Sequence, residues 1–415
     1  MNKSNVDVLA PSLRFQGFNK NWIKGPLGPL TIKVGSGVTP RGGSSVYTPT
    51  GVLFIRSQNV KNDQLDLSDP TFIPPSVHSV MSGSRVQPKD VLLNITGASI
   101  GRSCVVPGRV QEANVNQHVC ILRLEDVLDP NFLQSFLSSW RGQKLVYQSQ
   151  AGGGREGLNF ENIRTFIFNI PELPEQQKIA AFLSAVDTKS QQLQRKKELL
   201  EQYKKGVMQK IFSQEIRFKD EDGNDYPDWE EKRLGEFTVI TKGKGIAKIE
   251  VEEDGVTECI RYGELYTTYS EVISIVKSRT NVELSTLILS QVNDVIIPSS
   301  GETHIDLATA SYVPRGGIAL GGDINIIKSD QDGIFMAYCL NNEKKHEIAR
   351  LAQGSSVIHL YPNHLKELSV ILPCLVEQKR ISDLLSMVDK KIAYIELGIT
   401  KIMDFKKGLL QQMFI

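Results

Sequence analysis

The stretch of this sequence that comes nearest to a known chemical motif is GASIGRS, at residues 97–103. A phosphate-binding loop has four residues between its glycines and a lysine directly after the second one. Here only three residues separate Gly97 from Gly101, and Arg102 occupies the lysine position. The stretch is therefore interpreted as a turn between two strands.

No other pattern in the sequence predicts catalysis. The sequence has no Asn/Asp-Pro-Pro-Tyr/Phe motif of an amino-methyltransferase, and its six histidines lack the spacing of metal ligands. The glycine pairs at 35–37 and 243–245 do not lead from a buried strand into a helix, as dinucleotide-binding loops do. Asp187 and Asp389 are interpreted as solvated residues of helix faces or as partner contacts, not as paired catalytic acids.

Two long segments at matching places in the chain must position any functional residue. Residues 175–213 and 377–415 align without a gap at a constant offset of 202. The alignment pairs Glu175 with Glu377, and it repeats the tripeptide Lys-Lys-Gly near the end of each segment. An internal repeat of this length predicts a duplicated architecture.

Both segments carry apolar residues at seven-residue steps. The rows are Ile179, Val186, Leu193, Leu200 and Val207 in the first, and Ile381, Val388, Ile395, Ile402 and Leu409 in the second. Heptad rows of this length predict two long helices in a coiled coil. Their gapless alignment favours packing of the two copies on each other, with two unrelated dimerisation helices as the alternative.

The charge balance excludes a strongly basic domain. Residues 27–173 contain 13 Lys and Arg residues and 11 Asp and Glu residues. Residues 234–373 contain 12 Lys and Arg residues and 18 Asp and Glu residues. Any nucleic-acid contact must therefore use local patches or share the phosphate charge with partners. The five scattered cysteines, the lack of a signal peptide and the lack of a long apolar run predict a reduced, cytoplasmic protein without a membrane contact.

The segments before the two long helices have the same order of elements. Each begins with Leu-Gly and continues with short β-like runs, a helix and a short strand, with turn residues between them. The β-like runs are at 53–56, 90–95, 103–106 and 119–124, and at 260–262, 272–276, 294–297 and 324–327. The helices are at 129–150 and 333–351, and the strand before the first long helix is at 166–170. The apolar face expected for the first of these helices consists of Phe132, Leu133, Phe136, Leu137 and Trp140.

The predicted fold is α+β, with two globular mostly-β domains alternating with two long helices that pack as an antiparallel coiled coil in a pseudo-two-fold repeat. The predicted boundaries are 1–26 for a poorly structured lead-in, 27–173 for the first domain, 174–213 for the first helix, 214–233 for a linker, 234–373 for the second domain and 374–415 for the second helix. The long helices and the ends of the two domains, which we call the frame, are duplicated, whereas the middle parts of the two domains differ. This combination predicts two recognition modules, as a bipartite site on duplex DNA requires.

This organisation resembles the specificity subunit of type I restriction–modification systems over nearly the whole chain. The resemblance rests first on the alternation of two variable domains with two conserved helices. The motif PEQQKI at 174–179 and its second copy VEQKRI at 376–381 add to it, although Val376 and Arg380 depart from the first copy. The Lys-Lys-Gly tripeptides, the Leu-Gly starts and TGASIG at 96–101 also match.

The resemblance implies that each domain is a target recognition domain that reads one half of an asymmetric, gapped site on double-stranded DNA. It further implies that the helices set the spacing and dock two methylation subunits that methylate adenine, and that separate restriction subunits cleave DNA. S-adenosylmethionine, ATP and Mg are then expected in the partner subunits, with no cofactor and no catalytic residue in this chain.

Polar loop residues beside Arg or Lys could supply base readout and phosphate contacts, and about half of those selected are expected on the DNA face. In the first domain they are Thr39, Arg41, Arg56, Ser57, Gln58, Asn59, Thr96, Ser99, Arg102, Asn114, Asn116, Gln117, His118 and Arg155. In the second domain they are Lys242, Lys244, Lys248, Arg261, Tyr262, Ser299, Ser300, Thr303, His304, Ser355, Ser356 and His359.

Two other functions stay open at the level of the sequence. A coiled-coil adaptor without DNA specificity would explain the helices, but it leaves the divergence of the two middles unexplained. A single-chain modification or cutting enzyme would need catalytic motifs that the sequence does not contain.

Overall fold

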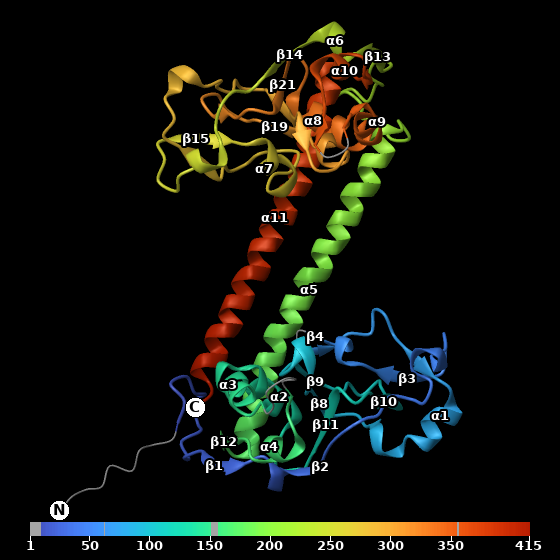
Figure 1. Ribbon diagram of the computed structural model, residues 1–415, viewed down its shortest axis with the longest axis vertical. Helices are drawn as coiled ribbons and strands as arrows, with labels where there is room; N and C mark the ends of the chain where they lie inside the picture. Colours follow the sequence, from blue (N-terminus) through green and yellow to red (C-terminus); the bar gives the residue numbers. More distant parts are fainter. Residues whose placement is uncertain (1–9, 62, 151–156, 355–356) are drawn as a thin grey trace, which may run out of the picture. The chain divides into compact units, whose positions relative to one another are not determined.

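The structure is a computed structural model that describes residues 10–61, 63–150, 157–354 and 357–415. The chain forms two units, which are described one at a time (Figure 1). Unit 1 consists of Met1–Arg195 and Leu397–Ile415, and unit 2 consists of Lys196–Glu396. Each unit therefore contains one variable domain and a part of each long helix.

Two four-stranded sheets form the β part of unit 1. The first sheet has the order β2 (Thr31–Ser36), β11 (Val119–Leu124), β8 (Val91–Asn94) and β9 (Ser103–Val105), all antiparallel. The second has the order β6 (Phe72–Ile73), β3 (Val52–Ile55), β10 (Ala113–Val115) and β7 (Arg85–Val86), with β3 and β10 parallel. Val91 and Leu93 of β8 belong to one core with Phe132, whereas Leu92 belongs to another with Ile55. The apolar run of β8 is therefore buried on both faces.

Two short helices follow β11, namely α2 (Pro130–Ser138) and α3 (Trp140–Gln148). The prediction of one continuous helix here is wrong, because Ser139 has an extended backbone and caps α3 by accepting a hydrogen bond from Gly142 N at 3.2 Å. The break turns Trp140 away from the predicted apolar face, and its side chain is 61% exposed. The other predicted members of that face are buried in the core: Phe132, Leu133, Phe136 and Leu137.

In unit 2 the first sheet has the same arrangement as in unit 1, whereas the second sheet has three strands in place of four. The order β14 (Thr238–Lys242), β21 (Ile324–Ser329), β17 (Val295–Pro298), β19 (Ser311–Tyr312) makes one sheet, and β16 (Ser278–Thr280), β15 (Thr257–Ile260), β20 (Ala319–Leu320) makes the other. The predicted strand at 272–276 is wrong, since Val272 makes only an isolated bridge to Tyr312. The predicted helix at 333–351 is divided into α8 (Gly333–Asn342) and α9 (Lys345–Leu351).

Shorter elements complete the two units. Unit 1 also contains α1 (Pro75–Val80), α4 (Phe160–Arg164), β4 (Val60–Lys61) and β5 (Gln64–Leu65). Unit 2 also contains α6 (Leu234–Phe237), α7 (Tyr262–Thr267), α10 (Pro362–Lys366), β18 (Ser300–Gly301) and β22 (Ile358–His359). Among the helices of the described residues, none combines the length and apolar character that a membrane crossing requires.

Residues 10–26 are packed on unit 1, so the expectation of a poorly structured lead-in does not hold for them. β1 (Ile23–Pro26) pairs antiparallel with β12 (Ile167–Ile170), and the Trp22 side chain is only 2% exposed. The linker before the second domain occupies the equivalent position in unit 2. Its strand β13 (Glu230–Arg233) pairs with β23 (Ser369–Leu372), as β1 pairs with β12. The repeat therefore includes the segment that precedes each Leu-Gly start.

The two long helices are α5 (Leu173–Phe212) and α11 (Leu375–Gln412). In unit 1, Lys406 near the end of α11 contacts Asp187 near the start of α5. In unit 2, Lys204 near the end of α5 contacts Asp389 near the start of α11. The helices therefore pack antiparallel within each unit. All residues of the predicted heptad rows are buried or half-buried, as a contact through these rows requires.

Candidate nucleic-acid interface

Four residues selected from the sequence form a polar cluster on unit 1. Thr96 Oγ1 is hydrogen-bonded to His118 Nδ1, and Gln117 Nε2 lies 3.0 Å from His118 Nε2. Thr39 Oγ1 donates to Gln117 Oε1. All four side chains are exposed or half-buried. This threonine–histidine cluster presents donors and acceptors at a surface, which direct readout of base edges requires.

Close backbone packing fixes the loop that carries Thr39. Gly37 N donates to Asn116 O at 3.2 Å, and a Cβ atom on Gly37 would lie 1.6 Å from Val115 O. Gly243 occupies a similar place in unit 2, where a Cβ atom would lie 2.1 Å from Gly321 O. These two glycines therefore serve the close approach of two backbone segments.

Several predicted contacts of unit 1 hold the domain together and do not face outwards. Asn114 is fully buried, and its amide donates to Ser84 Oγ at 2.7 Å. Asn59 is also buried, and its Oδ1 accepts a hydrogen bond from Arg56 N at 2.9 Å. Asn116 is 8% exposed. A DNA contact by any of these amides would require the domain to open, so we leave them out of the proposed interface.

The other predicted residues of unit 1 lie nearer to the surface. Asn94 Nδ2 donates to Ser57 O at 2.9 Å and to Ser99 Oγ at 3.1 Å, which joins the two loops that carry these serines. The guanidinium of Arg56 lies over the Tyr47 ring, with Cζ 5.8 Å from the ring centroid. The exposed members of this remaining group are Arg41, Gln58 and Arg102.

A second hydroxyl–imidazole pair occupies the matching strand end of unit 2. Ser300 Oγ lies 3.0 Å from His359 Nδ1, and Ser300 is 5% exposed whereas His359 is half-buried. Ser300 follows β17 as Thr96 follows β8, but the histidines come from different places, since His118 precedes β11 and His359 ends β22. Tyr361 lies beside His359 with ring centroids 6.1 Å apart and is 44% exposed. Sequence analysis missed Tyr361, although its place two residues after a candidate histidine was a usable signal.

The remaining candidates of unit 2 differ in exposure. Ser299 is 2% exposed, so it does not face a ligand in this structure. Arg261 and Tyr262 are half-buried. The exposed residues are Lys242, Lys244, Lys248, Thr303 and His304. Three further predicted contacts, Arg155, Ser355 and Ser356, lie outside the described residues.

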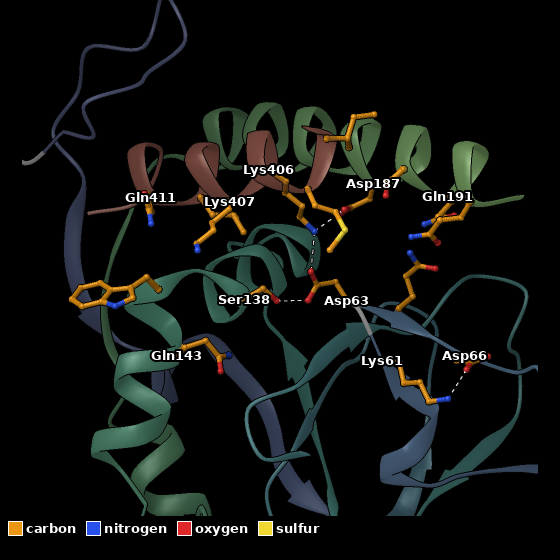
Figure 2. A pocket seen from close by; sticks show the side chains of 17 residues that line it. Lys61, Asp63, Asp66, Ser138, Gln143, Asp187, Gln191, Lys406, Lys407 and Gln411 are labelled. Carbon is orange, nitrogen blue, oxygen red and sulfur yellow. Dashed lines mark hydrogen bonds and ion pairs between the residues drawn. The ribbon is translucent and has the colours of Figure 1, made fainter. Parts of the chain in front are cut away.

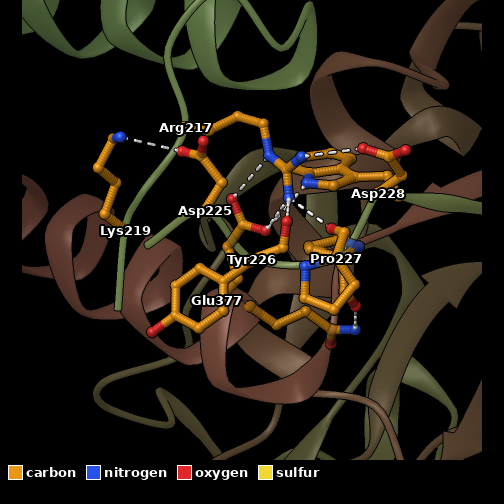
Figure 3. A network of polar contacts seen from close by, with 10 residues as sticks. Arg217, Lys219, Asp225, Tyr226, Pro227, Asp228 and Glu377 are labelled. Carbon is orange, nitrogen blue, oxygen red and sulfur yellow. Dashed lines mark hydrogen bonds and ion pairs between the residues drawn. The ribbon is translucent and has the colours of Figure 1, made fainter. Parts of the chain in front are cut away.

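An arginine holds the start of each long helix. Arg14 Nε and Nη2 each donate to one carboxylate oxygen of Glu175, both at 2.7 Å. Arg217 makes the same bidentate contact with the fully buried Glu377, at 3.3 and 2.9 Å (Figure 3). The hydrogen bond to the glutamate raises the pKa of each arginine. We call these contacts the arginine clasps, and they give the Glu of the repeated helix motif a structural role.

The glutamine after each of these glutamates joins the helix start to the variable domain. Gln176 Oε1 accepts a hydrogen bond from Asp129 N at 2.8 Å. Gln378 Oε1 accepts one from Asp332 N at 3.0 Å. Asp129 and Asp332 are themselves the caps of α2 and α8. The Glu-Gln motif thus fixes each domain to its long helix, and it does so with buried side chains.

A half-buried lysine of α11 lies between two carboxylates in unit 1 (Figure 2). Lys406 Nζ lies 2.9 Å from Asp63 Oδ2 and 2.6 Å from Asp187 Oδ1. Ser138 Oγ of α2 donates to Asp63 Oδ1 at 2.5 Å. Burial raises the pKa of Asp187, whose side chain is 27% exposed. Its carboxylate is bound to Lys406, so the first alternative, a solvated residue, is wrong, and the second, a partner contact, stays a prediction. Lys406, Asp63 and Asp187 are called the unit 1 lysine cluster.

A cluster of the same form lies in unit 2. Lys204 Nζ lies 2.8 Å from Asp389 Oδ1 and 3.2 Å from Glu271 Oε2. Tyr338 Oη donates to Asp389 Oδ2, and the lysine also lies over the Tyr338 ring, 5.1 Å from its centroid. Lys204, Glu271 and Asp389 are called the unit 2 lysine cluster. Sequence analysis missed both clusters, although the 202 offset already paired their lysines and their aspartates.

The titratable residues are arranged for structure and not for metal binding. Within the described part of the chain, no group of three or more His, Cys, Asp or Glu side chains is placed to hold a metal ion. The close carboxylates of the lysine clusters are each bound to a lysine, which leaves the polar loops as the candidate interface.

Known proteins are similar to this chain in sequence and in fold. Residues 79–202 and 226–402 match the family model of the type I restriction modification DNA specificity domain. The specificity subunit of the type I restriction enzyme MjaVIII of Methanocaldococcus jannaschii is 29% identical over 250 residues, which are 56% of this chain and 57% of that protein. The putative MjaX specificity subunit of the same organism is 22% identical over 353 residues, 82% and 81% of the two chains.

The solved structure of the S subunit of a type I system from M. genitalium has the same fold, with a TM-score of 0.63 and 15% identity over 98% of this chain and 99% of that one. The family model covers more than half of this chain, including parts of both variable domains and of both long helices. The chain therefore belongs to the family of type I restriction–modification DNA specificity subunits, the non-catalytic part of the type I complex.

Proposed function

We propose that this chain gives a type I restriction–modification complex its sequence specificity, with each variable domain reading one half of a bipartite, gapped DNA site. The observation that carries this proposal is the pair of hydroxyl–imidazole contacts at matching strand ends, Thr96–His118 and Ser300–His359. Thr96 and the two imidazoles are half-buried and can donate and accept hydrogen bonds to base edges, whereas Ser300 is 5% exposed and holds His359. A common frame that presents different side chains suits a protein that reads two different half-sites.

Exposed cations of the same two variable domains supply the phosphate contacts. They are Arg41 and Arg102 in unit 1 and Lys242, Lys244 and Lys248 in unit 2. The second domain nevertheless has 12 Lys and Arg against 18 Asp and Glu. We therefore propose that partner subunits make much of the phosphate contact, and that the chain alone binds DNA weakly.

The long helices set the spacing of the half-sites and dock two methylation subunits, which bind S-adenosylmethionine and methylate adenine. Several apolar side chains of these helices are exposed, including Phe405 at 54% in unit 1 and Tyr394 at 77% in unit 2. Exposed apolar groups on a helix suit a protein interface. Restriction subunits, which use ATP and Mg, would join the same complex. The proposed recognition domains are residues 27–173 and 234–373.

The test is adenine-methylation mapping in cells that express the methylation subunit with and without this chain. A gapped, two-part motif should appear only when the chain is present. His118→Asn should then change the bases accepted in one half-site, and His359→Asn should change those in the other, because an amide places its donor and acceptor at other positions than the ring nitrogens. The expected loss at the original base is about tenfold, in line with ~1–3 kcal/mol for a base-reading contact.

Arg102→Ala serves as the matched control for the histidine variants. The loss of a phosphate contact should weaken methylation of all sequences about equally and leave both half-sites as they were. If the histidine variants also left both half-sites unchanged, the proposed interface would be wrong. A confirmed complex without any motif would favour the adaptor function, and methylation by the chain alone would favour the enzyme.

A further inference from the structure

Each lysine cluster combines one acid of the duplicated frame with one acid of the variable domain. The frame supplies Lys406 with Asp187 in unit 1 and Lys204 with Asp389 in unit 2, and these pairs correspond at the 202 offset. The other acids, Asp63 and Glu271, differ in residue type, and they do not correspond at that offset.

The two domain acids also come from different local structures. Asp63 lies at the turn between β4 and β5, where it adopts a left-handed backbone with φ of 64°. Aspartate tolerates this conformation better than most residues. Glu271 lies in the segment after α7, and its carbonyl accepts a hydrogen bond from Tyr312 N of β19 at 2.8 Å. Two unlike segments thus bring a carboxylate to the equivalent lysine of each unit.

Burial explains why such a carboxylate matters to the lysine. The Lys406 side chain is 16% exposed and the Lys204 side chain is 14% exposed. A buried ammonium needs partners for its charge and for its three donors. The frame aspartate satisfies only part of this demand, so a domain that lacks the second acid leaves the lysine less well paired.

The contact also joins parts of the molecule that lie far apart in the sequence. In unit 1, Asp63 joins the β4–β5 hairpin to α11 through Lys406 and to α2 through Ser138 (Figure 2). In unit 2, Glu271 joins the edge of the domain to α5. Neither acid belongs to the hydroxyl–imidazole pair of its domain.

We propose that Asp63 and Glu271 are positioning residues, which fix each recognition domain on the helix pair and thereby set the gap between the half-sites without reading a base. This inference rests on the proposed function, because it concerns how two half-sites are held at one spacing. The frame lysine is the common hydrogen-bond donor, and each variable domain contributes its own carboxylate.

The test uses the complete complex with methylation subunits and DNA that carries the two half-sites with gaps varied by single base pairs. The variants are Asp63→Asn and Glu271→Gln, which keep the side-chain shape and remove the charge. The matched controls are Asp66→Asn, which lies on the same hairpin and pairs with Lys61, and the exposed Asp254→Asn of unit 2. Asp63→Glu tests rescue by a carboxylate.

We expect both variants to keep the two half-site sequences and to lose discrimination between gaps. The ratio of methylation at the original gap to methylation at a gap one base pair longer or shorter should fall about tenfold, as for the loss of one charged hydrogen bond. The controls should leave the ratio unchanged, and Asp63→Glu should restore part of it. Hydrogen exchange in residues 57–66 should increase for Asp63→Asn and not for Asp66→Asn.

Three results would overturn the inference. The first is an unchanged gap ratio, the second is a change in the bases of a half-site, and the third is an equal loss of methylation at every gap with a lower melting temperature. If the unaltered chain produced no gapped motif, the proposed function would fail instead. The exchange experiment on the chain alone would still decide whether Asp63 holds the hairpin.

Discussion

In unit 1 and unit 2 the starts of the long helices are bound by the same residue types. The contacts between the long helices and the middle of each variable domain use different residue types. The arginine clasps, Arg14 with Glu175 and Arg217 with Glu377, have the same bidentate form in both units. The glutamine contacts that follow them are also the same. The lysine clusters agree in the helix residues and differ in the acid of the domain.

This difference distinguishes contacts within the duplicated frame from contacts that involve the part of each domain proposed to read DNA. Contacts that join helix starts to the ends of a domain recur with the same residue types, because both partners belong to the duplicated frame. Contacts to the middle of a domain have the same chemistry in both units, a carboxylate bound to a lysine, but they use a different acidic residue. The reason is that the middle parts of the two domains differ in sequence. The hydroxyl–imidazole pairs vary most, as their histidines come from different places in the chain.

The largest expected effect comes from breaking a clasp. Arg14→Met should destabilise unit 1 by about 3 kcal/mol, because Glu175, 3% exposed, would keep a buried charge without its partner. Arg217→Met should destabilise unit 2 by less. Glu377 would still accept a hydrogen bond from Trp229 Nε1 at 3.1 Å, whereas the equivalent Trp22 Nε1 makes no hydrogen bond within the described residues. Urea unfolding of the two variants measures this difference, expected at about 1 kcal/mol.

The surface lysine Lys20 provides the control for the clasp. Its ion pair with Glu172 is exposed, so Lys20→Met should change stability by less than about 1 kcal/mol. Equal losses for Arg14→Met and Arg217→Met would show that Trp229 contributes nothing, and the two clasps would then be equivalent.

A smaller and more symmetric effect is expected for the buried glutamines. Gln176→Leu and Gln378→Leu should each cost about 2 kcal/mol, since each leaves a backbone N–H of the domain without its acceptor. Thermal unfolding with calorimetry measures both losses. Gln209, exposed on the same helix, is the control, and Gln209→Leu should have little effect. A large difference between the two glutamine variants would contradict the equivalence of the frame contacts.

The repeat and the heptad rows were enough to predict the long helices and their pairing, because both depend on local periodicity. The breaks at Ser139 and after Asn342 could not be predicted in this way. At Ser139 a single cap residue overrides a continuous apolar pattern, whereas Lys344 before α9 makes no side-chain cap hydrogen bond. The lead-in was misjudged for another reason. Trp22 and Arg14 are isolated in a polar segment, and only the fold brings them to their partners.

The candidate interface was predictable in part. The stretch from Asn114 to His118 was selected for its amides, but β10 places Asn114 in the interior and leaves only Gln117 and His118 near the surface. Residue type alone does not show which side of a strand a side chain occupies. The lysine clusters depend on contacts between residues more than 200 positions apart in unit 1, and a single sequence does not reveal which acid completes them.

The smallest perturbation is chemical labelling, which reports on the two units separately. Burial raises the pKa of Cys104 and Cys120 in unit 1 and of Cys339 in unit 2 to about 12, and that of Cys259 to about 11. Only the thiolate reacts, so at pH 8 these thiols stay protonated as well as buried. Iodoacetamide should therefore modify Cys374, which is partly exposed, well before the others, as peptide mass spectrometry can measure.

The same labelling in increasing urea tests whether the units lose their structure together. In Arg14→Met, the thiols of unit 1 should become reactive at lower urea than those of unit 2, because only unit 1 loses a clasp. In Arg217→Met the order should reverse. Simultaneous labelling of Cys104 and Cys339 in both variants would show that the two units unfold as one, and a change in one frame contact would then weaken both recognition domains at once.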